Sequence, residues 1–135
     1  MRVGAALDRL VRERAQSRCE YCRMHQSLQG ATFHVEHIIP LVAGGETNPG
    51  NLALACPGCN LKKADHQTAI SPESGACVPV FNPRENQWND HFAWNGYWVE
   101  PESAIGAATI DWLELNQPRR LLIREAESHF GLYPP

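Results

Sequence analysis

Apolar and polar residues follow a helical period at the start of the chain. Across residues 3–16 an apolar residue recurs every three or four positions, and arginines occupy the positions between them. The apolar positions are Val3, Leu7, Leu10, Val11 and Ala15. This pattern predicts an amphipathic helix that leads into Cys19.

The next stretch predicts two short strands and a second helix. Residues 31–38, "ATFHVEHI", are rich in β-formers and alternate loosely, and residues 51–56, "NLALAC", form a second short apolar run. The loop between them is rich in turn residues, with Gly44-Gly45 and Asn48-Pro49-Gly50. Helix-forming residues follow Cys59, so the expected order is helix, strand, loop, strand, helix.

Beyond residue 70 the pattern changes to aromatic strands followed by helices. Residues 77–81 and 91–100 have strand character, and Asn95-Gly96 predicts a two-residue hairpin turn. Ser103 is a plausible cap for a helix over 103–115, and a last helix of about 117–130 stops near Gly131. We therefore expect an α+β protein with a core in residues 1–70 and an extension in residues 71–135 packed on that core.

Composition indicates a globular chain without a strong bias towards nucleic acid. The 135 residues are 43% hydrophobic and 20% charged, with a formal net charge of −3, which argues mildly against a purely charge-driven nucleic-acid binder. Residues 1–23 nevertheless hold six arginines against three acidic residues, a local charge of +3. The arginines are Arg2, Arg9, Arg12, Arg14, Arg18 and Arg23. They form either a phosphate-binding face or simply a solvated one.

The cellular compartment decides whether the five cysteines form disulfides or bind metal. The N-terminus lacks the uninterrupted apolar run of a signal peptide, and no run approaches the roughly 18 apolar residues of a spanning helix. We therefore expect a cytoplasmic protein with no membrane association. Cysteines stay reduced there, so a metal or a catalytic role takes precedence over disulfides.

Two cysteine pairs have the spacing of a zinc site. Cys19-Glu20-Tyr21-Cys22 and Cys56-Pro57-Gly58-Cys59 are both C-x2-C, and 33 residues separate them. Two such turns can complete a tetrahedral Zn²⁺ site, with disulfides or an iron centre as alternatives. Four thiolates leave no open coordination position, which predicts a structural zinc rather than a catalytic one. The remaining Cys77 is expected to be a small buried apolar residue.

The segment between and around these pairs resembles the HNH endonuclease family in its cysteine-flanked form. Residues 33–63, "FHVEHIIPLVAGGETNPGNLALACPGCNLKK", carry an acid-His pair, a proline after two apolar residues, a glycine-rich loop, Asn-Leu and C-x2-C-Asn-x-x-Lys. The resemblance covers about residues 18–66. It implies a ββα-metal (His-Me finger) core that uses a divalent cation, Mg²⁺ or Mn²⁺ or another, to hydrolyse DNA.

The resemblance also implies the roles of individual residues. His37 would be the general base, Glu36 and Asn60 would hold the catalytic cation, and Asn51 would tie the loop between the strands. Lys63 sits where the family often has a lysine, and with its neighbour Lys62 it is expected to contact phosphate. His34 could line the same groove and touch substrate or the cation, or be a partly exposed strand histidine.

These residue types suit phosphodiester cleavage on chemical grounds alone. The reaction needs a base for water, a neutraliser for charge on phosphorus and help for the leaving oxygen. A neutral histidine serves as a base near pH 7, and hard oxygen ligands hold a divalent cation. Glu36 replaces the aspartate that is most common in the family, and its extra methylene moves the carboxylate by about a bond length.

Other functions fit parts of the same sequence. A zinc-dependent nucleic-acid-binding or protein-interaction module without catalysis would keep the cysteines but not need Glu36, His37 and Asn60. The extension could instead dock a partner protein or support a homodimer. The substrate is expected to be DNA, with RNA not excluded, and the four tryptophans are expected to serve core and hairpin packing more than base stacking.

Overall fold

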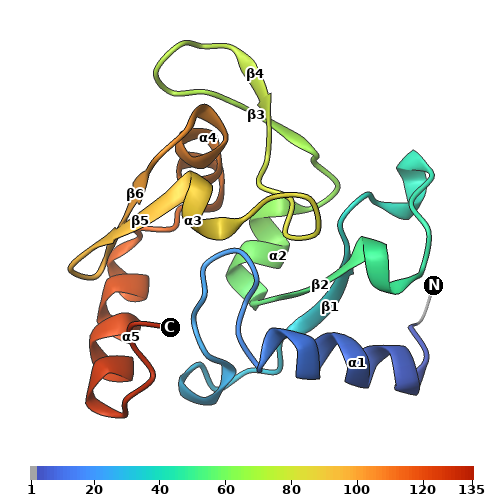
Figure 1. Ribbon diagram of the computed structural model, residues 1–135, viewed down its shortest axis with the longest axis horizontal. Coiled ribbons are helices and arrows are strands. Elements are labelled where there is room, and N and C mark those ends of the chain that lie inside the picture. The colour runs from blue at the N-terminus through green and yellow to red at the C-terminus, as the bar shows by residue number, and fades with distance from the viewer. Residues whose placement is uncertain (1–2) are drawn as a thin grey trace. The chain divides into compact units, whose positions relative to one another are not determined.

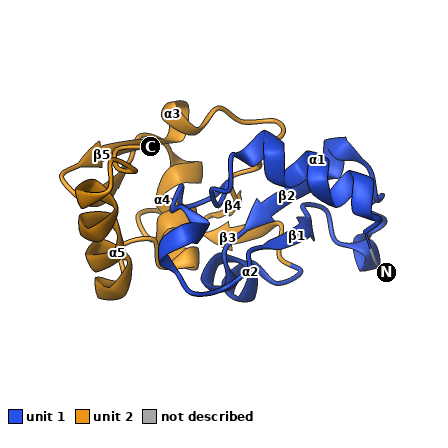
Figure 2. Cartoon of the chain, turned by 90° about the horizontal axis from the view of Figure 1, so that it is seen from below, with its two compact units in different colours: residues 1–65 blue, residues 66–135 orange. Residues whose placement is uncertain are grey.

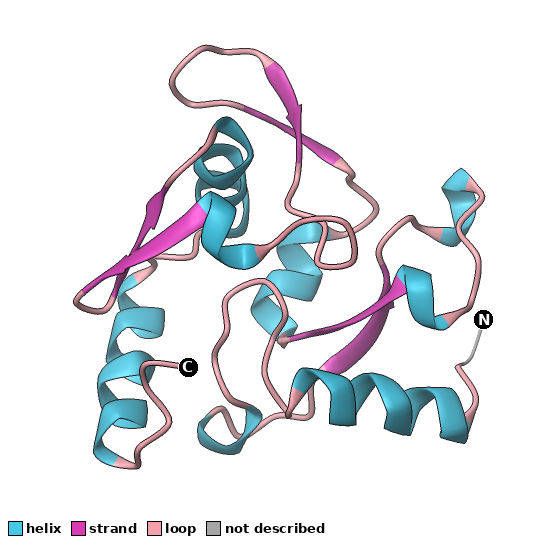
Figure 3. Ribbon diagram, viewed as in Figure 1, coloured by secondary structure: helices cyan, strands magenta, loops and turns pink. Residues whose placement is uncertain are grey.

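The computed structural model describes residues 3–135 and has the expected α+β architecture. The chain divides between Asp65 and His66 into two compact units, coloured separately in Figure 2. Within the described residues the strands form three separate two-stranded antiparallel sheets, and the helices hold more of the chain than the strands do (Figure 3). No helix in this part of the chain is both long and apolar enough to cross a membrane.

The N-terminal unit is a β-hairpin between two helices. Its elements are α1 (Ala5–Ala15), β1 (His34–His37), β2 (Leu52–Ala55) and α2 (Pro57–Lys63). Both helices contact the hairpin, and Figures 1 and 2 show them on either side of it. Short 3₁₀ helices span Gln26–Leu28, Leu41–Ala43 and Pro49–Asn51. The predicted order of helix, strand, loop, strand, helix is confirmed.

The hairpin register follows from the burial of its two strands. β1 and β2 pair from His34 opposite Ala55 to His37 opposite Leu52. All four residues of β2 are buried, which is why that strand is a continuous apolar run, whereas β1 mixes exposed and buried positions. As expected from Pro40, β1 ends at His37.

Helix α2 begins earlier than its helix-forming residues suggested. It starts at Pro57 inside the second cysteine pair, because proline suits the first helical position, and the Cys56 sulfur accepts a hydrogen bond from the Cys59 amide at 3.4 Å. It ends at Lys63. The second cysteine pair is therefore itself a helix N-terminus, which fixes Asn60 and Lys63 relative to the cysteines.

Several arginines of the first segment serve the fold rather than an open phosphate-binding face. Arg14 donates to the carbonyls of Pro49 and Leu52 at 2.9 and 2.7 Å, which ties α1 to the start of β2. Arg18 donates to the Arg23 carbonyl at 2.8 Å, and Arg12 pairs with Asp8 at 2.7 Å. Arg2 lies outside the described residues.

The C-terminal unit combines two hairpins with three helices. Its elements are β3 (Thr68–Ile70), β4 (Cys77–Pro79), α3 (Trp88–His91), β5 (Phe92–Asn95), β6 (Trp98–Pro101), α4 (Ala104–Leu113) and α5 (Pro118–His129). The predicted Ser103 cap is confirmed, since its hydroxyl accepts from the Gly106 amide at 3.0 Å. β3 and α3 were not predicted, because three or four residues show no clear period.

Two local expectations in this unit were wrong. Asn95 pairs with Trp98, so the hairpin loop is Gly96-Tyr97 and not Asn95-Gly96. Gly96 has a φ of +60°, which glycine adopts without the steric penalty of a side chain. Cys77 is exposed rather than buried, because it begins a short strand whose only partner in the described sheet is β3.

Aromatic residues pack inside the C-terminal unit, as expected. Trp88 stacks on Trp94 with ring centroids 5.0 Å apart and also contacts Phe92. The buried Arg124 guanidinium lies 5.3 Å from the Trp94 ring centroid and donates to the Leu115 carbonyl at 2.6 Å. Trp98 is the exception, because about half of its surface is exposed.

Candidate active site and metal centre

The two cysteine pairs converge in the N-terminal unit. The four sulfur atoms of Cys19, Cys22, Cys56 and Cys59 lie within 4.8 Å of one another, and all four residues are buried. The Cys22 and Cys56 sulfurs are 3.8 Å apart, about the separation of two thiolates on a tetrahedral Zn²⁺ with Zn–S bonds of ~2.3 Å. No disulfide joins the four cysteines. The cluster therefore fits a structural zinc.

The first cysteine turn is tied directly to β2. The Glu20 amide donates to the Leu54 carbonyl at 2.8 Å, and the Glu20 carboxylate accepts from the Leu54 amide at the same distance. Burial, together with hydrogen bonds to the other cysteines, raises the pKa of the Cys19 thiol well above its usual value. A cation is what makes four thiolates tolerable in such a buried site.

A pocket of about 490 Å³ lies beside β1 and is lined by four of the predicted site residues. Its walls include His34, Glu36 and His37 from β1 and Asn60 from α2. The structure therefore brings the acid, the two histidines and the amide of the sequence motif to one cavity. Within residues 3–135, the cysteine cluster is the sole group of three or more His, Cys, Asp or Glu side chains whose ligand atoms converge.

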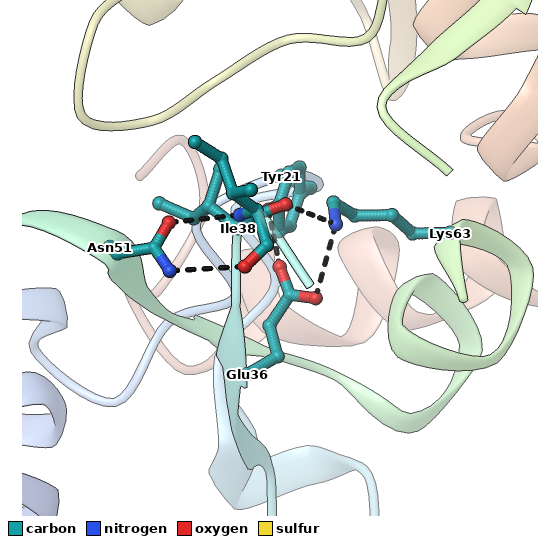
Figure 4. A network of polar contacts seen from close by, with 6 residues as sticks. Tyr21, Glu36, Ile38, Asn51 and Lys63 are labelled. Atoms are coloured by element: carbon teal, nitrogen blue, oxygen red, sulfur yellow. Dashed lines mark hydrogen bonds and ion pairs between the residues drawn. The ribbon is translucent and has the colours of Figure 1, made fainter. Parts of the chain in front are cut away.

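Glu36 is buried although it lines this pocket. Only 8% of its surface is exposed, and its carboxylate accepts a short hydrogen bond from the Tyr21 hydroxyl (Figure 4). The Lys63 ammonium lies 3.5 Å from the other carboxylate oxygen and donates to the Ile38 carbonyl at 3.1 Å. Burial raises the pKa of Glu36, and the nearby Lys63 charge and Tyr21 hydrogen bond partly oppose that rise.

Tyr21 is held as a neutral phenol in this network. It is fully buried, and desolvation followed by the adjacent Glu36 charge raises the pKa of its hydroxyl well above the usual value. A protonated phenol can donate to a carboxylate, whereas a phenolate would repel it. The contact is therefore an O–H donor on a carboxylate acceptor.

His37 is half-buried and is oriented by the glycine-rich loop. Its Nε2 atom lies 2.8 Å from the Thr47 hydroxyl oxygen. His37 also lines a second pocket on the α1 side of β1, of about 340 Å³, together with Arg12 and Thr32. Thr47 is not part of the sequence motif, so its contact with His37 could not be predicted and is seen only in the folded loop.

The loop itself is held by Asn51. The Asn51 amide oxygen accepts from the Ile39 amide at 2.9 Å, and its nitrogen donates to the carbonyls of Ile39 and Glu46 at 3.0 and 2.8 Å. Gly45 passes so close that an added Cβ would lie 1.8 Å from the Ile39 carbonyl oxygen. Asn51 and the close approach of Gly45 thus help to fix the loop that carries Thr47, together with backbone hydrogen bonds such as that from the Gly45 amide to the Pro40 carbonyl at 3.0 Å.

Replacement of Asn51 with alanine is expected to lower the free energy of unfolding by about 2 kcal/mol, because it leaves partly buried backbone groups without partners. Urea denaturation of both proteins measures the change. Asn48→Ala is the matched control, since the Asn48 amide makes its hydrogen bond to Glu46 at the exposed surface. An Asn51→Ala protein as stable as the parent would contradict this role.

The two lysines of the motif lie in different environments. Lys63 was expected to contact phosphate, but only 2% of its surface is exposed and its ammonium is occupied by Glu36 and Ile38. Lys62 is exposed on α2 and His34 is exposed on β1. Lys63 is buried because it is the last residue of α2 and faces the hairpin, whereas its neighbour Lys62 faces solvent.

Comparisons with known proteins bear on the segment that carries this site. Residues 19–66 match the family model described as HNH endonuclease. The chain is also similar to the Septu protein PtuB of Bacillus thuringiensis, with 28% identity over 116 residues. The aligned part is 82% of this chain but 41% of that protein, so the chain spans less than half the length of this relative. No solved structure matches the chain significantly.

Proposed function

Residues 19–66 are an HNH endonuclease domain, and from this premise we propose that the protein is a metal-dependent endonuclease that hydrolyses DNA phosphodiester bonds. One observation carries the proposal: Glu36, His37 and Asn60 line a single pocket in that domain. In this proposal Glu36 and Asn60 hold the cation and His37 is the base. The four-cysteine cluster beside them fits a structural Zn²⁺.

Glu36 and Asn60 are the proposed holders of a catalytic divalent cation, Mg²⁺ or Mn²⁺. A carboxylate and an amide oxygen are hard ligands, and they lie on one pocket from β1 and α2. The Asn60 side chain makes no hydrogen bond within the described residues, so its oxygen is available to a ligand. When bound, the cation supplies positive charge to the phosphate and to the leaving oxygen.

His37 is the proposed general base. In the tautomer whose Nε2–H donates to the Thr47 hydroxyl, Nδ1 keeps its lone pair, which can accept a proton from the attacking water. The Thr47 contact holds the ring in one orientation, so the base does not have to be ordered during the reaction. In this proposal Glu36 and Asn60 hold the cation that binds the phosphate, and His37 activates the attacking water.

Exposed residues beside the pocket are the proposed substrate contacts. His34 lines the pocket and is exposed, and Lys62 on α2 is an exposed cation that can approach a phosphate. Lys63 is not included, since its ammonium is buried against Glu36. These contacts follow the sugar-phosphate backbone and carry no base specificity of their own.

The zinc-loaded protein is expected to nick supercoiled plasmid when Mg²⁺ or Mn²⁺ is added and not when the cation is omitted. Omission is preferable to a chelator, because a chelator would also remove the structural zinc. Asn60→Ala is expected to slow nicking at least about 100-fold, because a catalytic cation contributes several kcal/mol to the transition state. Agarose gels resolve the supercoiled, nicked and linear forms.

Asn60→Ala prepared in parallel also controls for contaminating nuclease. Equal nicking by the two proteins would mean a contaminant or a wrongly assigned ligand. Absence of nicking by both, with zinc bound and the circular dichroism spectrum unchanged, would favour a nucleic-acid-binding or protein-interaction module over an enzyme.

A further inference from the structure

Tyr21 and Lys63 form a buried clamp around the Glu36 carboxylate, the proposed cation ligand. Both oxygens of Glu36 have a partner: the Tyr21 hydroxyl on one side and the Lys63 ammonium, 3.5 Å away, on the other (Figure 4). Both partners are more enclosed than Glu36 itself, with exposures of 0% for Tyr21 and 2% for Lys63. Neither takes part in proton transfer in the proposed reaction.

The clamp is built from both cysteine turns. Tyr21 stands between Cys19 and Cys22, and the adjacent Glu20 is bonded through both its amide and its carboxylate to Leu54. Leu54 in turn pairs with Val35, the neighbour of Glu36 on β1. Tyr21 is therefore fixed relative to the strand that carries the carboxylate.

The second arm of the clamp comes from α2. Lys63 lies one turn after Asn60 on the helix that begins inside the second cysteine pair. The same helix thus carries the proposed amide ligand and one support of the proposed carboxylate ligand. The other support, Tyr21, comes from the other cysteine pair.

We propose that Tyr21 is a positioning residue that fixes the Glu36 carboxylate for the catalytic cation, so that the first cysteine turn serves the active site as well as the zinc. This inference rests on the proposed function of Glu36 as a cation ligand. The physical reason is that a glutamate side chain has several rotatable bonds, and a hydrogen bond from a buried donor selects one of its orientations. Tyr21 thus sets the orientation of the Glu36 carboxylate and does not itself react.

The length of Glu36 fits this arrangement. A carboxylate one methylene shorter would start from the same position on β1 and would withdraw from the Tyr21 hydroxyl by about a bond length. Such a displacement lengthens a hydrogen bond beyond its effective range. Glu36→Asp should therefore break the contact while it keeps the charge.

The first measurement is Mn²⁺ binding to the zinc-loaded full chain, followed by the electron paramagnetic resonance signal of free Mn²⁺. Tyr21→Phe, which removes only the hydroxyl, is expected to weaken Mn²⁺ binding at least about 10-fold. Tyr97→Phe is the matched control, because it removes a hydroxyl that bonds to Ser128 in the C-terminal unit. Zinc content and thermal midpoint verify that each variant is folded.

A double-mutant cycle shows whether Tyr21 acts through Glu36. In a Glu36→Gln background, Tyr21→Phe is expected to cause no further loss of Mn²⁺ affinity. The same loss in both backgrounds would overturn the inference, as would a Tyr21→Phe protein that binds Mn²⁺ like the parent. If Tyr21→Phe fails to fold, Glu36→Asp takes its place: unchanged Mn²⁺ affinity in that variant would equally overturn it.

Plasmid nicking by the same proteins separates the inference from the proposed function. If the parent binds Mn²⁺ through Glu36 but nicks nothing, the enzyme assignment fails while the positioning role of Tyr21 stands on the binding data. If the parent nicks and Tyr21→Phe nicks equally fast with equal Mn²⁺ affinity, the inference fails and the function stands.

Discussion

Replacement of Cys56 with serine is expected to abolish zinc binding and to unfold the N-terminal unit. The four cysteine sulfurs lie within 4.8 Å of one another in a buried cluster, and the two turns that carry them come from segments on either side of β1. Structural Zn²⁺ in small domains contributes on the order of 10 kcal/mol of apparent binding free energy, which is also folding free energy. That contribution is comparable with the whole stability of a typical domain.

The Cys56→Ser experiment combines zinc stoichiometry with circular dichroism and thermal melting. Nicking should be lost with the fold, because Asn60 and Lys63 follow directly from the second cysteine turn. Cys77→Ser is the matched control, because Cys77 is exposed and lies outside the cluster. A Cys56→Ser protein with full zinc content and an unchanged melting profile would show that the cluster is not a zinc site.

Replacement of His37 with alanine is expected to reduce metal-dependent nicking by about 10²- to 10⁴-fold, the usual contribution of a positioned general base. The fold should survive, because His37 is half-buried and the only side-chain hydrogen bond recorded for it among the described residues is the one with Thr47. The measurement is the initial rate of plasmid nicking at saturating Mn²⁺. Mn²⁺ affinity should be unchanged, since the proposed ligands are Glu36 and Asn60.

His129→Ala controls for the loss of a histidine as such, because His129 is exposed at the end of α5 in the C-terminal unit. Activity of His37→Ala close to that of the parent would remove His37 from the mechanism. A parallel loss of Mn²⁺ affinity would instead indicate that His37 is a ligand and that another group is the base.

Spacing and period in the sequence predicted the order of the two α-helices and two strands of the N-terminal unit, but not its short 3₁₀ helices or the start of α2 at Pro57. The C-x2-C pairs predicted a four-cysteine cluster, because a two-residue gap lets both thiolates of a pair reach one ion and two such pairs complete a tetrahedral site. The alternation around His34–His37 and the apolar run of Leu52–Ala55 predicted the two strands. Glu36, His37 and Asn60, which line one pocket, were also singled out by their motif positions.

Contacts between distant residues were decided by the tertiary structure. No pattern in the sequence singled out Tyr21, yet its hydroxyl reaches Glu36, fifteen positions away. Lys63 resembled a phosphate contact, but the packing of α2 on the hairpin buries its ammonium against the same carboxylate. Cys77 looked apolar and buried, and a short strand left it exposed.

The sequence by itself therefore determined the zinc-type cysteine cluster, the strand–loop–strand–helix order and the residues at the pocket. The structure alone decided which polar side chains are enclosed, which partner holds Glu36, and that Thr47 orients His37. The physical reason is that spacing and periodicity are local properties of the chain. Burial and hydrogen-bond partners depend on which segments pack together, and that is set by the fold as a whole.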